Sequence, residues 1–260
     1  MSANENGSPL PTEQVLGIHF FNGAPAEAME HLRQNGGCAV MPASPALMKL
    51  RDDEEFRRAL VGADVVLADS GLLALLWKLA TGRKLRNISG ITYLRHLIGG
   101  EGIQPGESAC WVFASDAGKE KAVRWLTANG CAVEARDCLL AGAGGAAQDH
   151  GLLLGIEERR PKHIIIAVAG GTQEELAVYL REYLLHRPAI HCVGAAVALL
   201  SGEEKPIPNW AQRYHVGWMI RFLTQPGMIL PRLGIALALT TMVFRYRSEL
   251  PPLRRRWANV

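Results

Sequence analysis

The chain lacks the groupings that mark metal sites and disulfide scaffolds. Its five cysteines, an odd number, include no CxxC pair and no zinc-like spacing. They mostly lie in apolar segments, as the reduced core cysteines of cytoplasmic proteins do. No secretory signal peptide is visible, and residues 1–13 are polar, contain two prolines and are expected to be disordered. We therefore expect a cytoplasmic protein with no metal and no cofactor.

The 260-residue chain also lacks a strong net charge. A formal charge of +3 is too small to indicate nucleic acid binding, and none is expected. Acidic residues are nearly absent from the C-terminal part: after Lys205 only Glu249 stands against eight arginines, Arg213, Arg221, Arg232, Arg245, Arg247, Arg254, Arg255 and Arg256. A basic, aromatic and apolar end favours an anionic surface, either a membrane or a phosphate-bearing substrate. An ordinary solvated face is the alternative.

The apolar segment Met228–Phe244 is shorter than the roughly 20 residues that a bilayer-spanning helix needs. Its interruption by Pro231 and Arg232 and its basic flanks favour an interfacial helix, with a buried core helix as the alternative. The segment before it, 206–226, places aromatic side chains at helical i, i+4 spacing: Trp210, Tyr214, Trp218 and Phe222. We expect residues 205–260 to form a C-terminal helical, membrane-associating appendage.

The glycine fingerprint of nicotinamide-dependent enzymes is missing as well. No GxGxxG follows the first expected strand, and no acid lies about 20 residues further on in that context. The Gly/Ala-rich stretch 139–148 contains GxGG, follows no strong strand and is expected to be a loop. These absences disfavour a nicotinamide-dependent oxidoreductase.

Strand-like and helix-like segments alternate through residues 14–204. We expect strands at 15–21, 38–41, 65–68, 109–114, 132–135, 164–169 and 189–193, and helices at 26–34, 46–60, 72–80, 91–98, 119–129, 151–160 and from the 170–174 turn to about 185. This alternation predicts an α/β domain with a Rossmann-like, mostly parallel sheet and helices on both faces.

The strand at 65–68 ends on an acid and a turn, Asp69-Ser70-Gly71. Ligands bind at the carboxyl ends of strands in α/β proteins, so a lone carboxylate there is a candidate general base. The alternative is that Asp69 only caps the following helix.

Small and polar residues follow other strands too, at Ser115-Asp116, at 170–174 and at Gly194. Small residues let a ligand approach the backbone, and helix N-termini favour phosphate. We therefore expect a nucleotide site at this edge of the sheet, although glycines that only make tight turns would give the same pattern.

Four segments, in this order and spacing, resemble the WecG/TagA/CpsF glycosyltransferases (family 26) from about Gly17 to Tyr246. They are GIHFFNGAPAEAMEHL, ALVGADVVLADSGLLALLWKLATGRKLRNISGITYL, VAGGTQEELAVYL and CVGAAVALLSGEEKPIPNWAQRYHVGWMIRFLTQP. The last segment looks like the family's Arg-Ala-Pro-x-Trp motif and Glu-Trp-x-x-Arg helix, at Trp210, Arg213, Trp218 and Arg221.

The resemblance implies a hexosyl- or N-acetylhexosaminyltransferase of cell-surface polysaccharide biosynthesis. It would move a sugar from a UDP-sugar to a polyprenyl-diphosphate-linked acceptor, with inversion, without metal and with Asp69 as general base. The substrate-binding positions that we expect are Ser44, Ser70, Gly71, Thr92, Ser115, Gly170, Gly171, Gln173, Glu174, Gly194, Arg213 and Arg221.

In this interpretation Arg213 and Arg221 stabilise the leaving UDP, with lipid-headgroup contact or solvation as the alternative. Gln173 and Glu174 hold sugar hydroxyls or uracil, or Glu174 only favours its helix N-terminus. The resemblance further implies a homo-oligomer, peripheral on the inner face of the bacterial plasma membrane.

The chain departs from the family pattern at polar positions. Pro42 and Ser44 stand where the family has threonine and asparagine, Thr92 and Ala198 where it has aspartate, Ser70 where it has glycine and Gly171 where it has proline. These departures motivate a second hypothesis, that the protein is a catalytically weak or inactive relative. It would then act as a nucleotide-sugar-binding or assembly module in an exopolysaccharide pathway.

Overall fold

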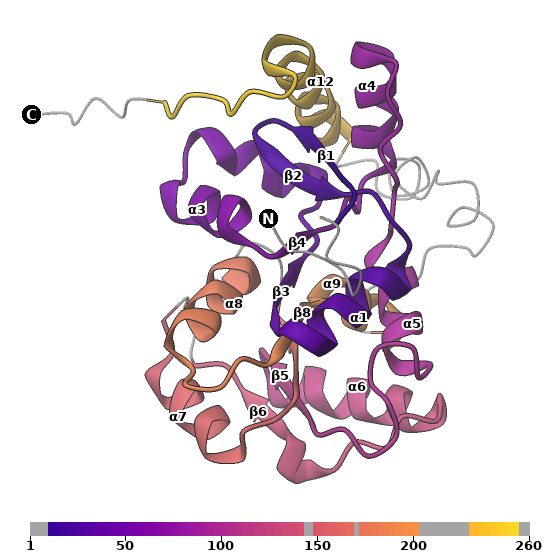
Figure 1. Cartoon of the computed structure of the whole chain (residues 1–260), viewed down its shortest axis with the longest axis vertical. Helices are drawn as coiled ribbons and strands as arrows, with labels where there is room; N and C mark the ends of the chain where they lie inside the picture. The colour runs from indigo at the N-terminus through magenta and orange to yellow at the C-terminus, as the bar shows by residue number, and fades with distance from the viewer. Residues whose placement is uncertain (1–9, 143–147, 169–171, 203–228, 255–260) are drawn as a thin grey trace, which may run out of the picture.

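The computed structural model describes residues 10–142, 148–168, 172–202 and 229–254, and its centre is an eight-stranded sheet between helices (Figure 1). All neighbouring strands are parallel except the antiparallel edge pair β1 and β2. The expected mostly parallel α/β fold is thus confirmed. The order across the sheet is β1 (Thr12–Val15), β2 (Ile18–Phe21), β4 (Val65–Val66), β3 (Gly37–Val40), β8 (Ala189–Cys192), β7 (His163–Ala167), β5 (Ala109–Phe113) and β6 (Cys138–Leu140).

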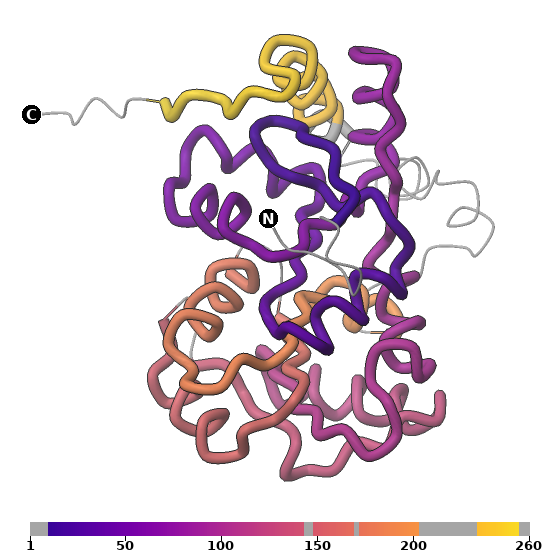
Figure 2. The backbone as a smooth tube through the Cα atoms, in the orientation of Figure 1, coloured from indigo at the N-terminus to yellow at the C-terminus, as the bar shows by residue number. Residues whose placement is uncertain are grey.

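Each face of the sheet packs against its own set of helices. One face contacts α2 (Ser44–Leu47), the 3-10 helix η1 (Met48–Arg51), α3 (Glu54–Gly62), α4 (Gly71–Thr81), α7 (His150–Arg159), α8 (Thr172–Tyr183) and α12 (Ile229–Tyr246). The other contacts α1 (Pro25–Asn35), α5 (Gly90–Ile98), α6 (Asp116–Ala128) and α9 (Gly194–Leu200). Helices α3 and α8, far apart in sequence, lie side by side (Figure 2). Because both faces are covered, the inner strands contain continuous apolar runs, such as 164–166 in β7.

Short polar side chains set the start of several helices by accepting a backbone N–H from the residue three positions on. Ser70 does this for α4, where its Oγ accepts from Leu73 N at 3.2 Å. The same bond is made at α3, α5, α6 and α7 by Asp53, Ser89, Ser115 and Asp149.

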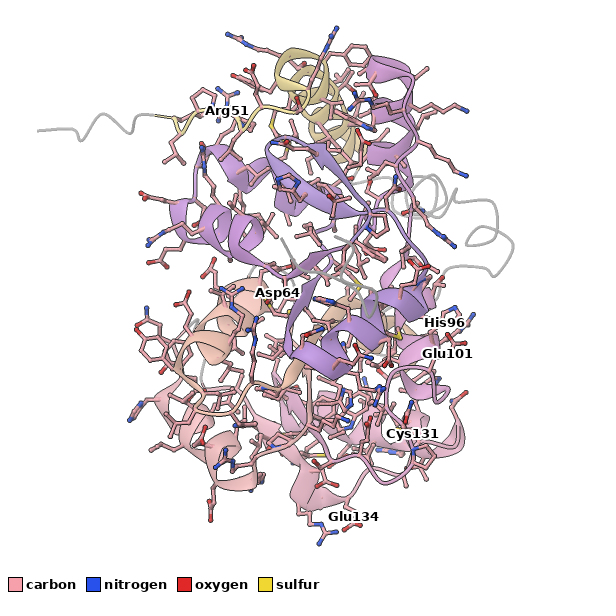
Figure 3. All side chains as sticks on the ribbon, in the orientation of Figure 1. Arg51, Asp64, His96, Glu101, Cys131 and Glu134 are labelled. Carbon is pink, nitrogen blue, oxygen red and sulfur yellow. The ribbon has the colours of Figure 1, made fainter. Side chains whose placement is uncertain are left out.

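Asp64, just before β4, joins the two halves of the sheet (Figure 3). Its carboxylate accepts hydrogen bonds from Cys38 N (2.9 Å) in β3, from Arg181 Nη1 (3.2 Å) in α8 and from Arg187 Nη2 (3.1 Å) before β8. Gly37 lies against it with a φ of 108°, and a Cβ there would lie 2.5 Å from Asp64 Cγ. Glycine is therefore required at this position.

The single strand expected at 15–21 is wrong, because this segment is a hairpin. Leu16 (φ 52°) and Gly17 (φ 76°) both adopt the left-handed conformation and form the turn between β1 and β2. Strand β1 starts at Thr12 and Leu10 is buried, so ordered structure begins inside the segment 1–13 that we expected to be disordered.

Two further expectations between the clearest strands need correction. The helix expected over 46–60 is divided into α2, η1 and α3, because Asp53 caps α3 and starts a new helix. The strand expected at 132–135 is replaced by η2 (Ala135–Asp137) and then β6, which takes the first residues of the expected loop 139–148. The side chains of β6 are partly exposed, so the edge strand shows no apolar pattern.

The apolar C-terminal segment forms α12, which packs one face on the α/β body. Leu239, Met242 and Val243 are buried in the core that α4 and α2 share, whereas Leu233 and Leu237 are exposed. Across the described ranges, no helix has the length and apolarity to cross a bilayer. The boundary expected at 204/205 and the aromatic segment 206–226 lie outside the described residues.

Candidate functional site

The candidate site lies at the carboxyl ends of the central strands β4, β3 and β8. The neighbouring strands β3 and β8 send the chain to opposite faces of the sheet, β3 into α2 and β8 into α9. A divergence of this kind leaves a crevice at the strand ends, where open α/β sheets bind their ligands. The first turns of α4, α5, α8 and α9 surround this edge.

Asp69 stands at this edge, after the backbone bridge of Ala68 with Asn87, and is half-buried. Its Oδ1 accepts a hydrogen bond from Gly90 N at 2.9 Å, the first amide of α5. A Cβ built on Gly90 would lie within 4.0 Å of Asp69 Oδ2, Met41 Sδ and Ala196 Cβ. Side chains from three segments that are distant in sequence therefore surround the start of α5 at Gly90.

The alternative that Asp69 caps the following helix is wrong, because Ser70 is the N-cap of α4. Asp69 instead holds the N-terminus of α5, a helix that starts 21 residues later in the sequence. A backbone amide and the positive end of a helix dipole favour negative charge at that place.

Ser70 and Ser44 connect the ends of β4 and β3. Their hydroxyl oxygens lie 2.5 Å apart, and Ser70 Oγ also accepts Leu73 N. Ser70 is buried, whereas Ser44 is half-buried and Gly71, the first residue of α4, is likewise half-buried. Of the two hydroxyls, that of Ser44 is the more accessible to a ligand.

Thr92 lies in the first turn of α5, two residues from the amide that binds Asp69. Its backbone N–H donates to Ser89 Oγ (3.1 Å), and its own Oγ1 lies 2.9 Å from the same oxygen. The side chain is exposed. Thr92 is therefore part of the helix cap and borders the cluster around Asp69.

Gln173 and Glu174, in the first turn of α8, are 4% and 1% exposed. Gln173 Oε1 accepts from Gly194 N (3.1 Å), and Gln173 Nε2 donates to Glu174 Oε1 (3.2 Å). This contact ties the start of α8 to the start of α9. A Cβ on Gly194 would lie 1.7 Å from Val168 O, so the glycine at this position serves a close approach of two backbones.

Ser115 is exposed, and its side chain caps α6 through a hydrogen bond from Gly118 N (3.2 Å). It follows β5, two strands away from β8, and its hydrogen bond to Gly118 does not join it to the Asp69 cluster. The expected positions Gly170, Gly171, Arg213 and Arg221 lie outside the described residues, as do Trp210 and Trp218.

A comparison with known families finds one that matches most of the chain. A sequence model of the Glycosyl transferase WecG/TagA/CpsF family matches residues 13–254. The chain belongs to this family. No curated protein sequence matches it. Membership in the WecG/TagA/CpsF family implies glycosyltransferase activity in cell-surface polymer synthesis, with a sugar donor and an acceptor as substrates.

The structure also shows a group of residues for which the WecG/TagA/CpsF motifs gave no signal. Glu107, His163, His191 and Tyr93 form a continuous hydrogen-bonded chain beneath α5. The histidines lie in apolar strands, where the sequence shows only an interruption of the run. Their partners are 28 or more residues away, so local spacing gives no indication of the contact.

A cavity of about 420 Å³ lies at the opposite end of the sheet from Asp69. It is lined by residues around the start of β5 and the end of α7, among them Cys110, Arg136 and Arg159. Within the described ranges, no group of three acidic, histidine or cysteine side chains is arranged to hold a metal ion.

Proposed function

We propose that the protein transfers a hexosyl or N-acetylhexosaminyl group from a UDP-sugar to a polyprenyl-diphosphate-linked acceptor, with inversion, and that Asp69 is the general base. The observation that carries the proposal is the placement of Asp69 at the carboxyl end of β4, next to the strands β3 and β8 that diverge, with its Oδ1 bound by the Gly90 amide. The family supports the transferase class, and the position of the carboxylate supports its role.

In the proposed reaction the acceptor hydroxyl attacks the anomeric carbon from the side opposite UDP. Its proton passes to Asp69 as the new C–O bond forms, and the bond between the anomeric carbon and the UDP oxygen breaks. Because Oδ1 accepts the Gly90 amide, we assign the proton transfer to Oδ2. UDP leaves with the electron pair of the broken bond.

The leaving diphosphate needs hydrogen-bond donors or positive charge. Helix N-termini at this edge supply oriented backbone N–H groups, and we assign further charge to Arg213 and Arg221. Gln173 and Glu174 are nearly fully buried, so we assign them to donor binding chiefly through the turns that they hold. Ser44 and Thr92, which are more accessible, are the side chains that we place nearest to the sugar.

The test of this proposal is UDP release from UDP-sugars in the presence of a polyprenyl-diphosphate-linked saccharide. Asp69→Asn keeps the size of the side chain and is expected to lower kcat about 10²- to 10⁴-fold, the usual contribution of a general base. Asp116→Asn, an exposed aspartate at another strand end, is the matched control and should retain activity. Turnover by Asp69→Asn at the wild-type rate would exclude Asp69 as the base.

We also propose that the surface formed by α4 and α12 lies on an anionic membrane. Leu75 (51% exposed) and Leu79 (65%) share one face of α4 with Lys78. Helix α12, on which Leu233 and Leu237 are exposed, lies beside α4 (Figure 1). Exposed basic residues follow α4: Arg83, Lys84 and Arg86. An apolar face with a basic border is typical of interfacial binding.

Removing α12 would not test the membrane proposal, because its buried Leu239, Met242 and Val243 belong to the hydrophobic core of the α/β body. Vesicle flotation of a Leu75→Glu, Leu79→Glu double variant avoids the problem, since both side chains are exposed. Losing about 1 kcal/mol or more per leucine predicts at least tenfold weaker binding to phosphatidylglycerol-containing vesicles. Leu154→Glu, exposed on α7, is the control; equal flotation of all proteins would refute the surface.

The alternative function, a nucleotide-sugar-binding or assembly module with little turnover, is favoured by one observation. Thr92 and Ser70, which replace family residues of other chemistry, have hydroxyls occupied by helix caps. Calorimetry with UDP-sugars decides between the two functions when it is paired with the release assay. Tight binding without release supports the module, and efficient release excludes it.

A further inference from the structure

Four side chains form an unbroken hydrogen-bonded chain through the core on the α5 side of the sheet. Tyr93 Oη lies 2.9 Å from His191 Nδ1, His191 Nε2 lies 3.2 Å from His163 Nδ1, and His163 Nε2 lies 2.9 Å from Glu107 Oε2. Tyr93, His163 and His191 are fully buried, and the two imidazole rings are stacked with centroids 5.5 Å apart. Glu107 closes the chain near the surface at the amino end of β7.

The negative charge of Glu107 sets the donor and the acceptor of every hydrogen bond in this series of four side chains. Burial alone would raise the pKa of Glu107, but Lys162, the Gln104 amide and His163 together lower it to about 2, so this carboxylate only accepts. Burial lowers the pKa of His163, and lowers that of His191 to about 3, so both rings are neutral. His163 Nε2–H therefore donates to Glu107, His191 Nε2–H to His163 Nδ1, and the Tyr93 hydroxyl to His191 Nδ1.

The hydrogen-bonded chain ends at Tyr93 in α5, the helix whose Gly90 amide binds Asp69. Tyr93 lies in the first turn of α5, where its N–H donates to Ser89 O at 2.9 Å. Gly90, three residues earlier and therefore on the same side of the helix, donates to Asp69 Oδ1. The same turn of α5 thus carries a buried anchor to β8 and the amide that orients the candidate base.

We propose that Tyr93 is a positioning residue for catalysis: through His191, His163 and Glu107 it fixes α5 on the sheet so that the Gly90 amide holds the Asp69 carboxylate in its reactive orientation. Apolar contacts alone would permit small rotations of α5 on the sheet. A directional hydrogen bond between two buried groups restricts the helix to one orientation. This inference rests on the proposed role of Asp69 as general base.

The test is Tyr93→Phe, which removes one oxygen atom and leaves the ring in place. Because a displacement of about 1 Å at a reacting group can cost up to 10²-fold, we expect kcat to fall about tenfold while the KM values for donor and acceptor stay within about twofold. Tyr183→Phe, which removes the same atom from a side chain that is 61% exposed, is the control and should match the wild type.

A second readout does not depend on activity. The amide ¹H–¹⁵N signal of Gly90 reports its hydrogen bond to Asp69, and we expect it to move upfield in Tyr93→Phe and not in Tyr183→Phe. An unchanged Gly90 signal, or a moved signal with unchanged kcat, overturns the positioning role. Loss of thermal stability alone, with kcat and the Gly90 signal both as in the wild type, also overturns it.

If Tyr93→Phe does not fold, Glu107→Gln answers the same question, because it weakens the chain at its surface end and leaves α5 intact. We expect the same changes in kcat and in the Gly90 signal, smaller in size, and their absence overturns the proposal. Full turnover by Asp69→Asn would instead exclude the proposed base, while the Gly90 signal would still show whether Tyr93 sets this hydrogen bond.

Discussion

The close approach of Gly194 to Val168 gives a quantitative prediction for Gly194→Ala. The added methyl carbon would lie 1.7 Å from Val168 O and 2.6 Å from Val168 C, and both neighbours are backbone atoms that cannot rotate away. Relief requires the start of α9 to move by more than an ångström. That movement also breaks the hydrogen bond from Gly194 N to Gln173 Oε1.

The cost of this substitution follows from two effects. Overpacking of a buried site costs up to about 3 kcal/mol, and the loss of one buried hydrogen bond costs about 1 kcal/mol. We therefore expect the free energy of unfolding to fall by about 4 kcal/mol. For a chain of this length a loss of that size lowers Tm by roughly 8–16 °C.

Chemical denaturation followed by circular dichroism measures this loss. Gly234→Ala is the matched control, because Gly234 lies in α12 with nothing within 4 Å of the added carbon. It should leave stability unchanged or raise it by up to about 1 kcal/mol, as glycine disfavours helices. If the two variants are equally stable, the backbone contact between the turns after β7 and β8 is not as described.

Two further predictions concern stability. Ser70→Ala removes the cap of α4 and the partner of Ser44, and denaturation should show a loss of about 1 kcal/mol. The hydrogen-bonded chain of Tyr93, His191, His163 and Glu107 predicts acid sensitivity. In the folded protein the pKa of His191 is lowered from 6.5 to about 3 and that of Glu107 from 4.5 to about 2. As the pH falls, the unfolded protein therefore takes up a proton at each of these groups before the folded protein does. The unfolding free energy should fall as pH decreases from about 6.5 to 2, less steeply in His191→Gln; equal slopes would contradict this linkage.

The sequence predicted the fold class because a strand that is covered on both faces consists of consecutive apolar residues. Residues 164–166 are the clearest such segment. It did not predict the hairpin at Leu16-Gly17, because leucine rarely adopts a left-handed conformation and gives no turn signal. Both residues of Asp69-Ser70 are good helix caps. The backbone conformation after β4 decides between them, and a local pattern does not contain that information.

Long-range contacts explain what remained unpredicted at the candidate site. The pairing of Asp69 with Gly90 depends on the backbone bridge between Ala68 and Asn87, which brings the turn before α5 to the end of β4. Gly194 was expected to make room for a ligand, whereas the structure shows it making room for the Val168 backbone. The two interpretations share one sequence signal, a glycine after a strand, and only the packing separates them.

The hairpin between β1 and β2 is completed by the far end of the chain. Leu16 N donates to Arg247 O (2.7 Å) and Gly17 N to Ser248 O (2.9 Å), and a Cβ on Gly17 would lie 2.4 Å from Leu250 Cβ. During synthesis the first strands emerge long before these carbonyl groups exist. The turn between these two strands therefore gains its last hydrogen-bond partners only when residues 247 and 248 have been made, and a nascent chain stopped before residue 247 would leave the Leu16 and Gly17 amides without them.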